Sequence, residues 1–121
     1  FNVTGIAQGV YLYDPAGHEL TLITEGDTRD SFKRSPLPAG RTDPAATAAA
    51  AIVITADTEK GSSSSNYLLE AGHVAQNIVL QCIPLDMGSV TTASFSADNL
   101  KKLLNLPDTE VPVYVLPVGK K

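Results

Sequence analysis

Apolar residues recur at alternating steps of three and four through residues 67–85, which is the spacing of one face of an α-helix. Four further positions, Leu69, Gly72, Val79 and Ile83, widen this apolar stripe on one side. Glu70, His73, Asn77 and Gln81 form a polar stripe on the opposite side. We therefore predict a long helix that is covered from several directions and that kinks or ends early at Pro84. Its core stripe is Leu68, Ala71, Ala75, Ile78, Cys82 and Leu85.

Upstream of this helix the pattern changes to alternation. Gly9 to Asp14 and Glu19 to Thr24 are rich in β-formers and flank a Pro/Gly turn, which predicts a β-hairpin. We expect Asp14 to open the turn, and we interpret His18 as a solvated turn residue rather than as a ligand or a base. Phe1 to Ile6 alternates as well and is expected to be the tail of a strand.

The middle of the chain is expected to be less regular. A short helix is predicted from Asp27 to Arg34, and three prolines between Pro36 and Pro44 predict an irregular connection. Ala45 to Ala51 has helical propensity, whereas the β-branched residues after it favour a strand at about Ala50 to Ala56. Asp57 to Asn66 is polar and serine-rich and predicts a mobile loop; its single glycine argues against a phosphate cradle.

Three elements are predicted after the long helix. These are a strand over residues 89–93, a helix from Ala97 to Leu104 and a strand from Val113 to Val118 that is apolar on both faces. Ser96 is the expected N-cap of the helix and Asn105 its C-cap. Hairpin-linked and crossover-linked strands together predict an α+β fold with a mixed or antiparallel sheet and a long central helix.

Composition narrows the function classes. The chain has 121 residues, enough for one domain or part of one. Its net charge is −4 and its basic residues are scattered. This charge distribution argues against nucleic-acid binding and weakly against binding to an anionic membrane surface. No apolar run approaches the roughly 20 residues that span a bilayer. Cys82 is the only cysteine and is expected to be a small core residue, and no metal-ligand spacing is present. The cytoplasm is slightly favoured, although a first residue other than Met and the Asn2-Val3-Thr4 triplet are compatible with export.

Five motifs in order, together with a hairpin that precedes them, resemble the C-terminal half of the nitroreductase family, most closely its SagB-type dehydrogenase branch. The hairpin Gly9 to Pro15 resembles the Gly-x-Tyr-x-Tyr-Asp-Pro hairpin that precedes the helix in that branch. The helix carries the branch's D/E-A-G-H-x-x-Q-N pattern at Glu70 to Asn77. The remaining matches are Gly88-Ser89, Phe95 to Leu100, Leu103 to Pro107 and Leu116 to Gly119.

The resemblance implies an FMN-binding, NAD(P)H-linked oxidoreductase that works as an intertwined homodimer with flavin at the subunit interface. In the family the N-terminal half supplies dimerising helices and an arginine-rich segment for the flavin phosphate, and nothing in this chain matches it. The chain is therefore expected to be the C-terminal part, residues 1–121, of a single nitroreductase-like domain that is incomplete without its N-terminal half.

The resemblance also implies a set of cofactor-binding residues. In the family the segment after the long helix approaches the flavin ring, and basic residues after the last strand help to hold its phosphate. A solvated basic tail is the alternative interpretation of the two lysines. The residues at these positions are Gly88, Ser89, Thr91, Thr92, Ala93, Lys120 and Lys121.

Two departures from the family pattern keep other hypotheses open. Ala93 stands where the family usually has Gly, and Lys60 is followed by Gly61 rather than by the Tyr of the Lys-Tyr pair that SagB-like azoline dehydrogenases use. A flavin-less descendant that serves as a binding or structural module is the main alternative, and an unrelated α+β adaptor is a third. No catalytic residue is assigned, because His73, Gln76 and Asn77 are expected to be structural and hydride chemistry belongs to the cofactor.

Overall fold

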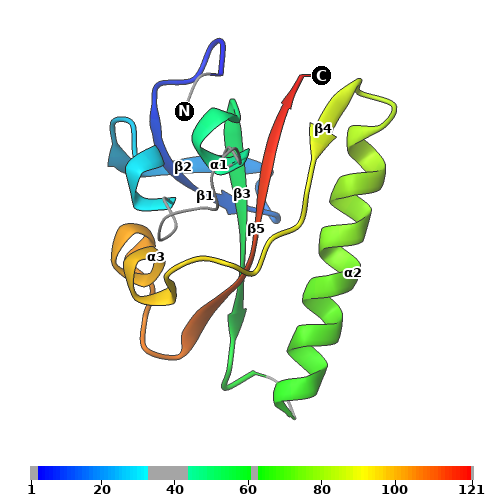
Figure 1. Ribbon diagram of the computed structural model, residues 1–121. Helices are drawn as coiled ribbons and strands as arrows, with labels where there is room; N and C mark the ends of the chain where they lie inside the picture. Colours follow the sequence, from blue (N-terminus) through cyan, green and yellow to red (C-terminus); the bar gives the residue numbers. More distant parts are fainter. Residues whose placement is uncertain (1–2, 33–43, 61–62, 121) are drawn as a thin grey trace, which may run out of the picture.

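The computed structural model of this chain describes residues 3–32, 44–60 and 63–120. A separate hairpin and a three-stranded antiparallel sheet with the order β3-β5-β4 provide its strands, and two of its helices are longer than one turn (Figure 1). The predicted α+β class with antiparallel sheets is confirmed. The strands are β1 (Gly9–Asp14), β2 (Glu19–Glu25), β3 (Ala50–Asp57), β4 (Met87–Ser89) and β5 (Glu110–Lys120); the helices are η1 (Arg29–Phe32), α1 (Pro44–Thr47), α2 (Ser64–Cys82) and α3 (Ala97–Leu104).

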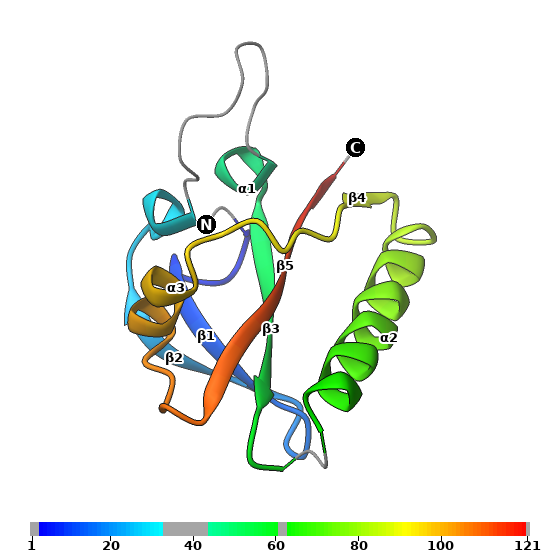
Figure 2. The same cartoon turned by 60° about the horizontal axis from the view of Figure 1, so that its bottom comes forward.

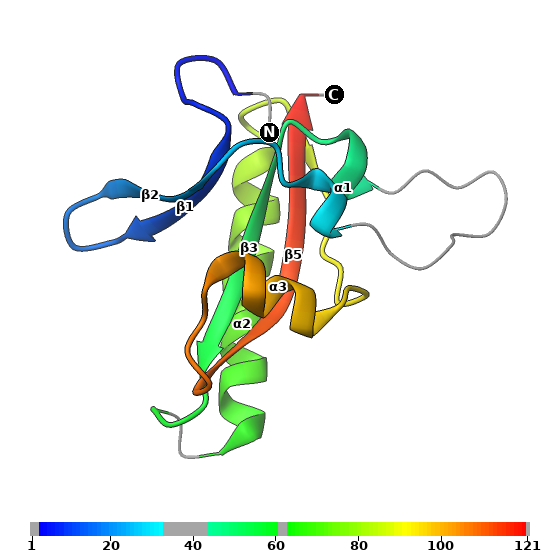
Figure 3. The ribbon, with the colours of Figure 1, turned by 90° about the vertical axis from the view of Figure 1, so that its left-hand side faces the viewer.

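The central strand β5 is covered on both faces. Helix α2 lies on one side of the sheet, and α1 and α3 lie on the other (Figures 1 and 3). Val115 packs with Ala45 of α1 and Leu100 of α3, whereas its neighbour Leu116 is fully buried on the side of α2. This arrangement explains why β5 is apolar on both faces, as the sequence predicts.

The long helix α2 uses its small residues to pack against the sheet. Ala71, Ala75 and Cys82 are buried, so the expected core role of Cys82 is confirmed. The prediction is wrong for Leu68, which is 51% exposed, and for Leu85, which is 56% exposed and lies beyond the helix. The sheet covers only one side of α2 (Figure 2), and Pro84 lacks the N–H that a further helical turn requires, so the helix ends at Cys82.

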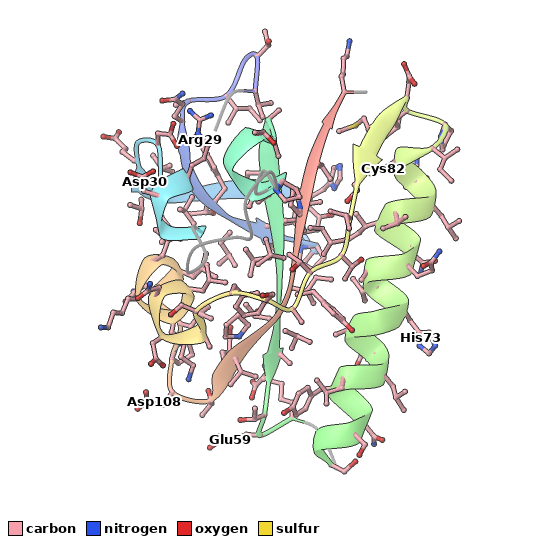
Figure 4. All side chains as sticks on the ribbon, in the orientation of Figure 1. Arg29, Asp30, Glu59, His73, Cys82 and Asp108 are labelled. Atoms are coloured by element: carbon pink, nitrogen blue, oxygen red, sulfur yellow. The ribbon has the colours of Figure 1, made fainter. Side chains whose placement is uncertain are left out.

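The polar stripe of α2 faces solvent, as predicted. Glu70, His73, Asn77 and Gln81 are all exposed, and His73 points away from the sheet (Figure 4). This arrangement is consistent with a structural role for the helix surface around His73.

The hairpin is confirmed, with β2 extending to Glu25. The Asp14 carboxylate accepts hydrogen bonds from the N–H groups of Ala16 and Gly17, so Asp14 opens the turn as expected. His18 is exposed, with its Nδ1 2.9 Å from the Tyr13 hydroxyl. The expected strand over Phe1 to Ile6 is wrong for its described part: residues 3–6 form a turn in which Gly5 has φ +86°, a conformation that breaks extended structure.

Several boundaries differ from the predicted ones. Ser64, Ser65 and Asn66 belong to α2 rather than to a loop, because Ser63 is already the N-cap of the helix. The strand predicted over residues 89–93 is displaced to Met87–Ser89, and beyond it only Thr92 forms a bridge, to Val115. The short helix predicted after Asp27 is a 3₁₀ turn, and the proline-rich connection lies largely outside the described residues.

Helix α3 matches its predicted bounds and caps. The Ser96 hydroxyl accepts a hydrogen bond from the Asn99 N–H at 3.4 Å, and Asn105 ends the helix in the left-handed conformation. Leu100, the innermost residue of α3, is fully buried against Ala45 and Val115. The caps at both ends and the burial of Leu100 therefore stabilise the same helix.

Candidate functional site

An open pocket of about 440 Å³ lies between α1 and the rim of the sheet, where β4 meets the end of β5. This volume is in the range of small-molecule and cofactor sites. Among the described residues that line the pocket, Lys120 is the only charged one, and the others have small side chains. The lining residues are Pro44, Thr47, Ala48, Ala49, Gly88, Ser89, Val90, Pro117, Val118, Gly119 and Lys120.

A pair of glycines forms one rung of the sheet in this pocket. Gly88 of β4 lies directly opposite Gly119 of β5. Because side chains alternate along a strand, Gly119 and Val115 lie on the same face of the sheet, the face toward α1 and α3. The rung therefore presents bare backbone toward α1. A β-carbon added to Gly119 would lie 3.5 Å from the Ala49 nitrogen, an ordinary contact.

The neighbouring rungs carry the polar groups of the pocket. Ser89 lies opposite Val118, and Met87 lies opposite Lys120, so Ser89 and Lys120 share the other face of the ladder. The Ser89 hydroxyl is buried and has no hydrogen-bond partner among the described residues. A buried hydroxyl without a partner costs roughly 1–3 kcal/mol, so this group destabilises the fold by about that amount.

The pocket brings together three of the residues that we expected from the sequence to bind a cofactor: Gly88, Ser89 and Lys120. About thirty residues separate β4 from the end of β5 along the chain. Thr91 and Ala93 are exposed and do not line it. Thr92 exchanges two backbone hydrogen bonds of 2.9 Å with Val115, and its hydroxyl accepts one from Ser94, so its backbone groups are already paired. Lys121 lies outside the described residues.

The pocket wall formed by Thr47, Ala48 and Ala49 was not expected from the sequence. These residues belong to an alanine-rich run without a chemical motif, and only the packing of α1 beside the end of β5 brings them to the pocket. Small side chains at the turn from α1 into β3 were the available signal, because they allow close approach of a ligand.

The groups with shifted pKa values lie elsewhere. Hydrogen bonds from Arg29 lower the pKa of Asp27 to about 2, and bonds from the Glu59 N–H and the Lys60 ammonium lower the pKa of Asp57. None of these residues lines the pocket.

No cluster of His, Cys, Asp and Glu with the geometry of a metal site occurs in residues 3–32, 44–60 and 63–120. None of the helices described there combines the length and apolarity of a membrane span. The pocket can thus contribute apolar contact and a positive charge.

The fold and this pocket are those of an α+β domain with a cofactor-sized site at the sheet rim. The family model of the nitroreductases, "Nitroreductase family", matches residues 4–120, and the chain belongs to this family.

Individual relatives agree with this assignment. A protein of Methanocaldococcus jannaschii assigned by name as a nitroreductase is 29% identical over 126 residues, which cover 99% of this chain and 61% of that protein. This chain thus spans less than two thirds of that relative's length.

Solved structures show the same fold. A protein of Anabaena variabilis, assigned by name as a nitroreductase, has a TM-score of 0.79 at 24% identity, over 97% of this chain and 25% of that one. A protein of Clostridium acetobutylicum, assigned by name as an NADH oxidase, has a TM-score of 0.56 at 34% identity, over 62% of this chain and 48% of that one. A protein of Clostridium difficile named an FMN-dependent nitroreductase has a TM-score of 0.57 at 23% identity, over 64% and 48%.

Proposed function

We propose that this protein is an FMN-dependent oxidoreductase of the nitroreductase type, which transfers two electrons from NADH or NADPH to a small organic acceptor such as a nitro, quinone or azoline compound. Membership of the nitroreductase family supports the class of reaction. The names of two relatives, one FMN-dependent and one an NADH oxidase, support the cofactor and the donor. The observation that carries the proposal is the single pocket that joins Gly88, Ser89 and Lys120.

The residues of the pocket fit this cofactor. Lys120, which lines the pocket, supplies the positive charge that a phosphate requires. Bare backbone at Gly88 and Gly119 allows a ring to come close. When bound, FMN supplies the hydride chemistry, and the protein binds it, orients it and excludes water from one side.

The proposal includes a homodimer. The outer face of α2 carries Leu69, Leu80 and Ile83, which are 66%, 51% and 62% exposed. Apolar side chains of this size on one face of a helix are typical of a partner surface. Light scattering on the purified protein checks this: a monomer at micromolar concentration, or a Leu80→Lys variant that remains a dimer, contradicts the proposed interface.

The SagB-type branch and an azoline acceptor are proposed on the helix and hairpin motifs alone. Lys60, near the position of the lysine in the Lys-Tyr pair, is exposed and forms an ion pair of 3.1 Å with Asp57. The second candidate function is a flavin-less binding module, which the departure at Ala93 favours. Flavin binding discriminates between the two.

The decisive experiment is a titration of the purified protein with FMN, followed by quenching of flavin fluorescence. Lys120→Gln removes a charge-assisted contact to the phosphate and is expected to raise the dissociation constant about tenfold. Lys102→Gln is the matched control, because Lys102 is an exposed lysine of α3 that does not line the pocket. A wild-type protein without flavin absorbance that does not take up FMN would remove the enzyme proposal and leave the binding module.

A further inference from the structure

We propose that the β1–β2 hairpin is a docking site for a partner protein, which adds an extended segment with basic and apolar side chains as a strand along the free edge of β2. The hairpin shares no residue with the pocket. The inference therefore does not depend on the proposed FMN function.

The hairpin leaves apolar side chains exposed. It projects from the rest of the molecule, away from β3 and β5 (Figure 3), and every residue of β2 is exposed. On one face Tyr11 lies directly opposite Leu22 and Tyr13 directly opposite Leu20. Tyr13, Leu20 and Leu22 are 51%, 52% and 40% exposed. A two-stranded hairpin on its own is only marginally stable in water, so a third strand that covers these side chains would stabilise it.

The outer edge of β2 is open to such a strand. Among the strands of the described residues β2 pairs only with β1, and the sheet β3-β5-β4 is separate from the hairpin. An unpaired strand edge presents N–H and C=O groups with which an extended segment of another chain can pair. The seven residues of β2 give this edge the length of an ordinary strand.

The charge of the hairpin selects the chemistry of the partner. Residues 9–30 contain five acidic residues and one basic residue, so they carry the whole net charge of −4 and the rest of the chain is neutral overall. Glu19 and Glu25 lie at the two ends of β2, and neither forms an ion pair with a described residue. Two carboxylates about 20 Å apart along an extended strand fit a segment with a basic residue near each end.

A second copy of this chain does not fit the same edge. Antiparallel pairing of two β2 strands would place Glu19 of each copy opposite Glu25 of the other, and like charges at opposed positions destabilise a strand pair. A basic segment avoids this repulsion. Its cationic groups can also lie over the rings of Tyr11 and Tyr13, which favours lysine or arginine beside the apolar side chains.

The test uses two fluorescently labelled peptides that match β2 in length, Lys-Val-Thr-Val-Thr-Val-Lys and Glu-Val-Thr-Val-Thr-Val-Glu. The peptide with lysine ends is expected to bind the purified protein and to shift the amide NMR signals of β2. The double variant Glu19→Gln/Glu25→Gln is expected to weaken this binding about tenfold. Glu59→Gln/Glu70→Gln is the matched control, because it removes two exposed carboxylates outside the hairpin.

Both double variants change only exposed side chains and are expected to keep the wild-type melting temperature. The proposal fails if neither peptide binds, if both bind equally well, or if the shifted amide signals lie outside the hairpin. It also fails if the two double variants bind the lysine peptide equally well. If light scattering shows a dimer that Leu20→Lys converts to a monomer, a second copy covers the hairpin and the proposal is wrong. None of these outcomes bears on FMN binding.

Discussion

The hydroxyl group of Ser89 is buried opposite Val118, and no described residue forms a hydrogen bond with it. It lies on the rung next to Gly88 and Gly119, at the edge of the pocket. A buried polar group that the fold leaves unpaired destabilises the protein.

Ser89→Ala is expected to raise the free energy of unfolding of the FMN-free protein by roughly 1 kcal/mol, because it removes an unpaired buried hydroxyl. The same gain is expected with FMN bound, because the hydroxyl is buried on the opposite face of the ladder from Gly88 and Gly119. Chemical denaturation with and without FMN measures both values. A loss of stability in the FMN-free variant would mean that the hydroxyl has a partner in the folded protein.

Ser96→Ala is expected to lower the free energy of unfolding by about 1 kcal/mol, because the Ser96 hydroxyl accepts the Asn99 N–H at the start of α3. The loss should be global, since α3 carries the fully buried Leu100. Ser94→Ala, at an exposed position two residues earlier, is the control. Equal stability of the two variants would show that the cap contributes nothing.

Asn105→Gly is expected to stabilise the protein by roughly 0.5 kcal/mol. Asn105 has φ 51° and ψ 44°, a left-handed conformation that glycine adopts more easily than asparagine. Asn105→Val should destabilise the protein, because a β-branched residue is strained there. Thermal unfolding of the wild type, Asn105→Gly and Asn105→Val gives the order of their stabilities. An Asn105→Val variant as stable as the wild type would contradict the expected order.

The carboxyl group of Asp27 is expected to titrate near its pKa of about 2, because hydrogen bonds from the Arg29 side chain and backbone stabilise its charged form. Its pKa in the folded protein lies below the ordinary aspartate value of 3.8, so its contribution to stability is present above about pH 4 and is lost as the pH falls through about 2. The pair is partly exposed, so salt should weaken the effect.

NMR titration of the Asp27 side chain in wild type and in Arg29→Met measures this shift. The variant is expected to bring the midpoint back toward the ordinary range of an aspartate. An unchanged midpoint for Asp27 in the variant would show that Arg29 is not the cause.

The sequence predicted most accurately the elements whose ends carry their own chemistry. Ser96 and Asn105 bound α3, and Asp14 opens the hairpin turn, because in each case the side chain or conformation of one residue satisfies nearby backbone groups. The start of α2 was missed. Its first turn is made of Ser64, Ser65 and Asn66, which have weak helix propensity and were assigned to a loop.

For the pocket, a family resemblance led us to expect Gly88, Ser89 and Lys120 as cofactor-binding residues, but we did not predict from the sequence that Thr47 to Ala49 also line it. A periodic pattern reports which side of an element is buried, but not which other element covers it. The outer leucines of α2 illustrate the same limit, since apolar spacing alone does not separate a core residue from a partner surface.

The sequence by itself determined the hairpin, the two main helices, the α+β class and the resemblance to the nitroreductases, because these depend on local periodicity, capping and short motifs. The tertiary structure decided that β5 is the central strand, that Gly88 and Gly119 face each other, and that α1 closes one side of their pocket. These relationships depend on the register between strands that are distant in the sequence, and register is fixed only when the layers of the fold pack together.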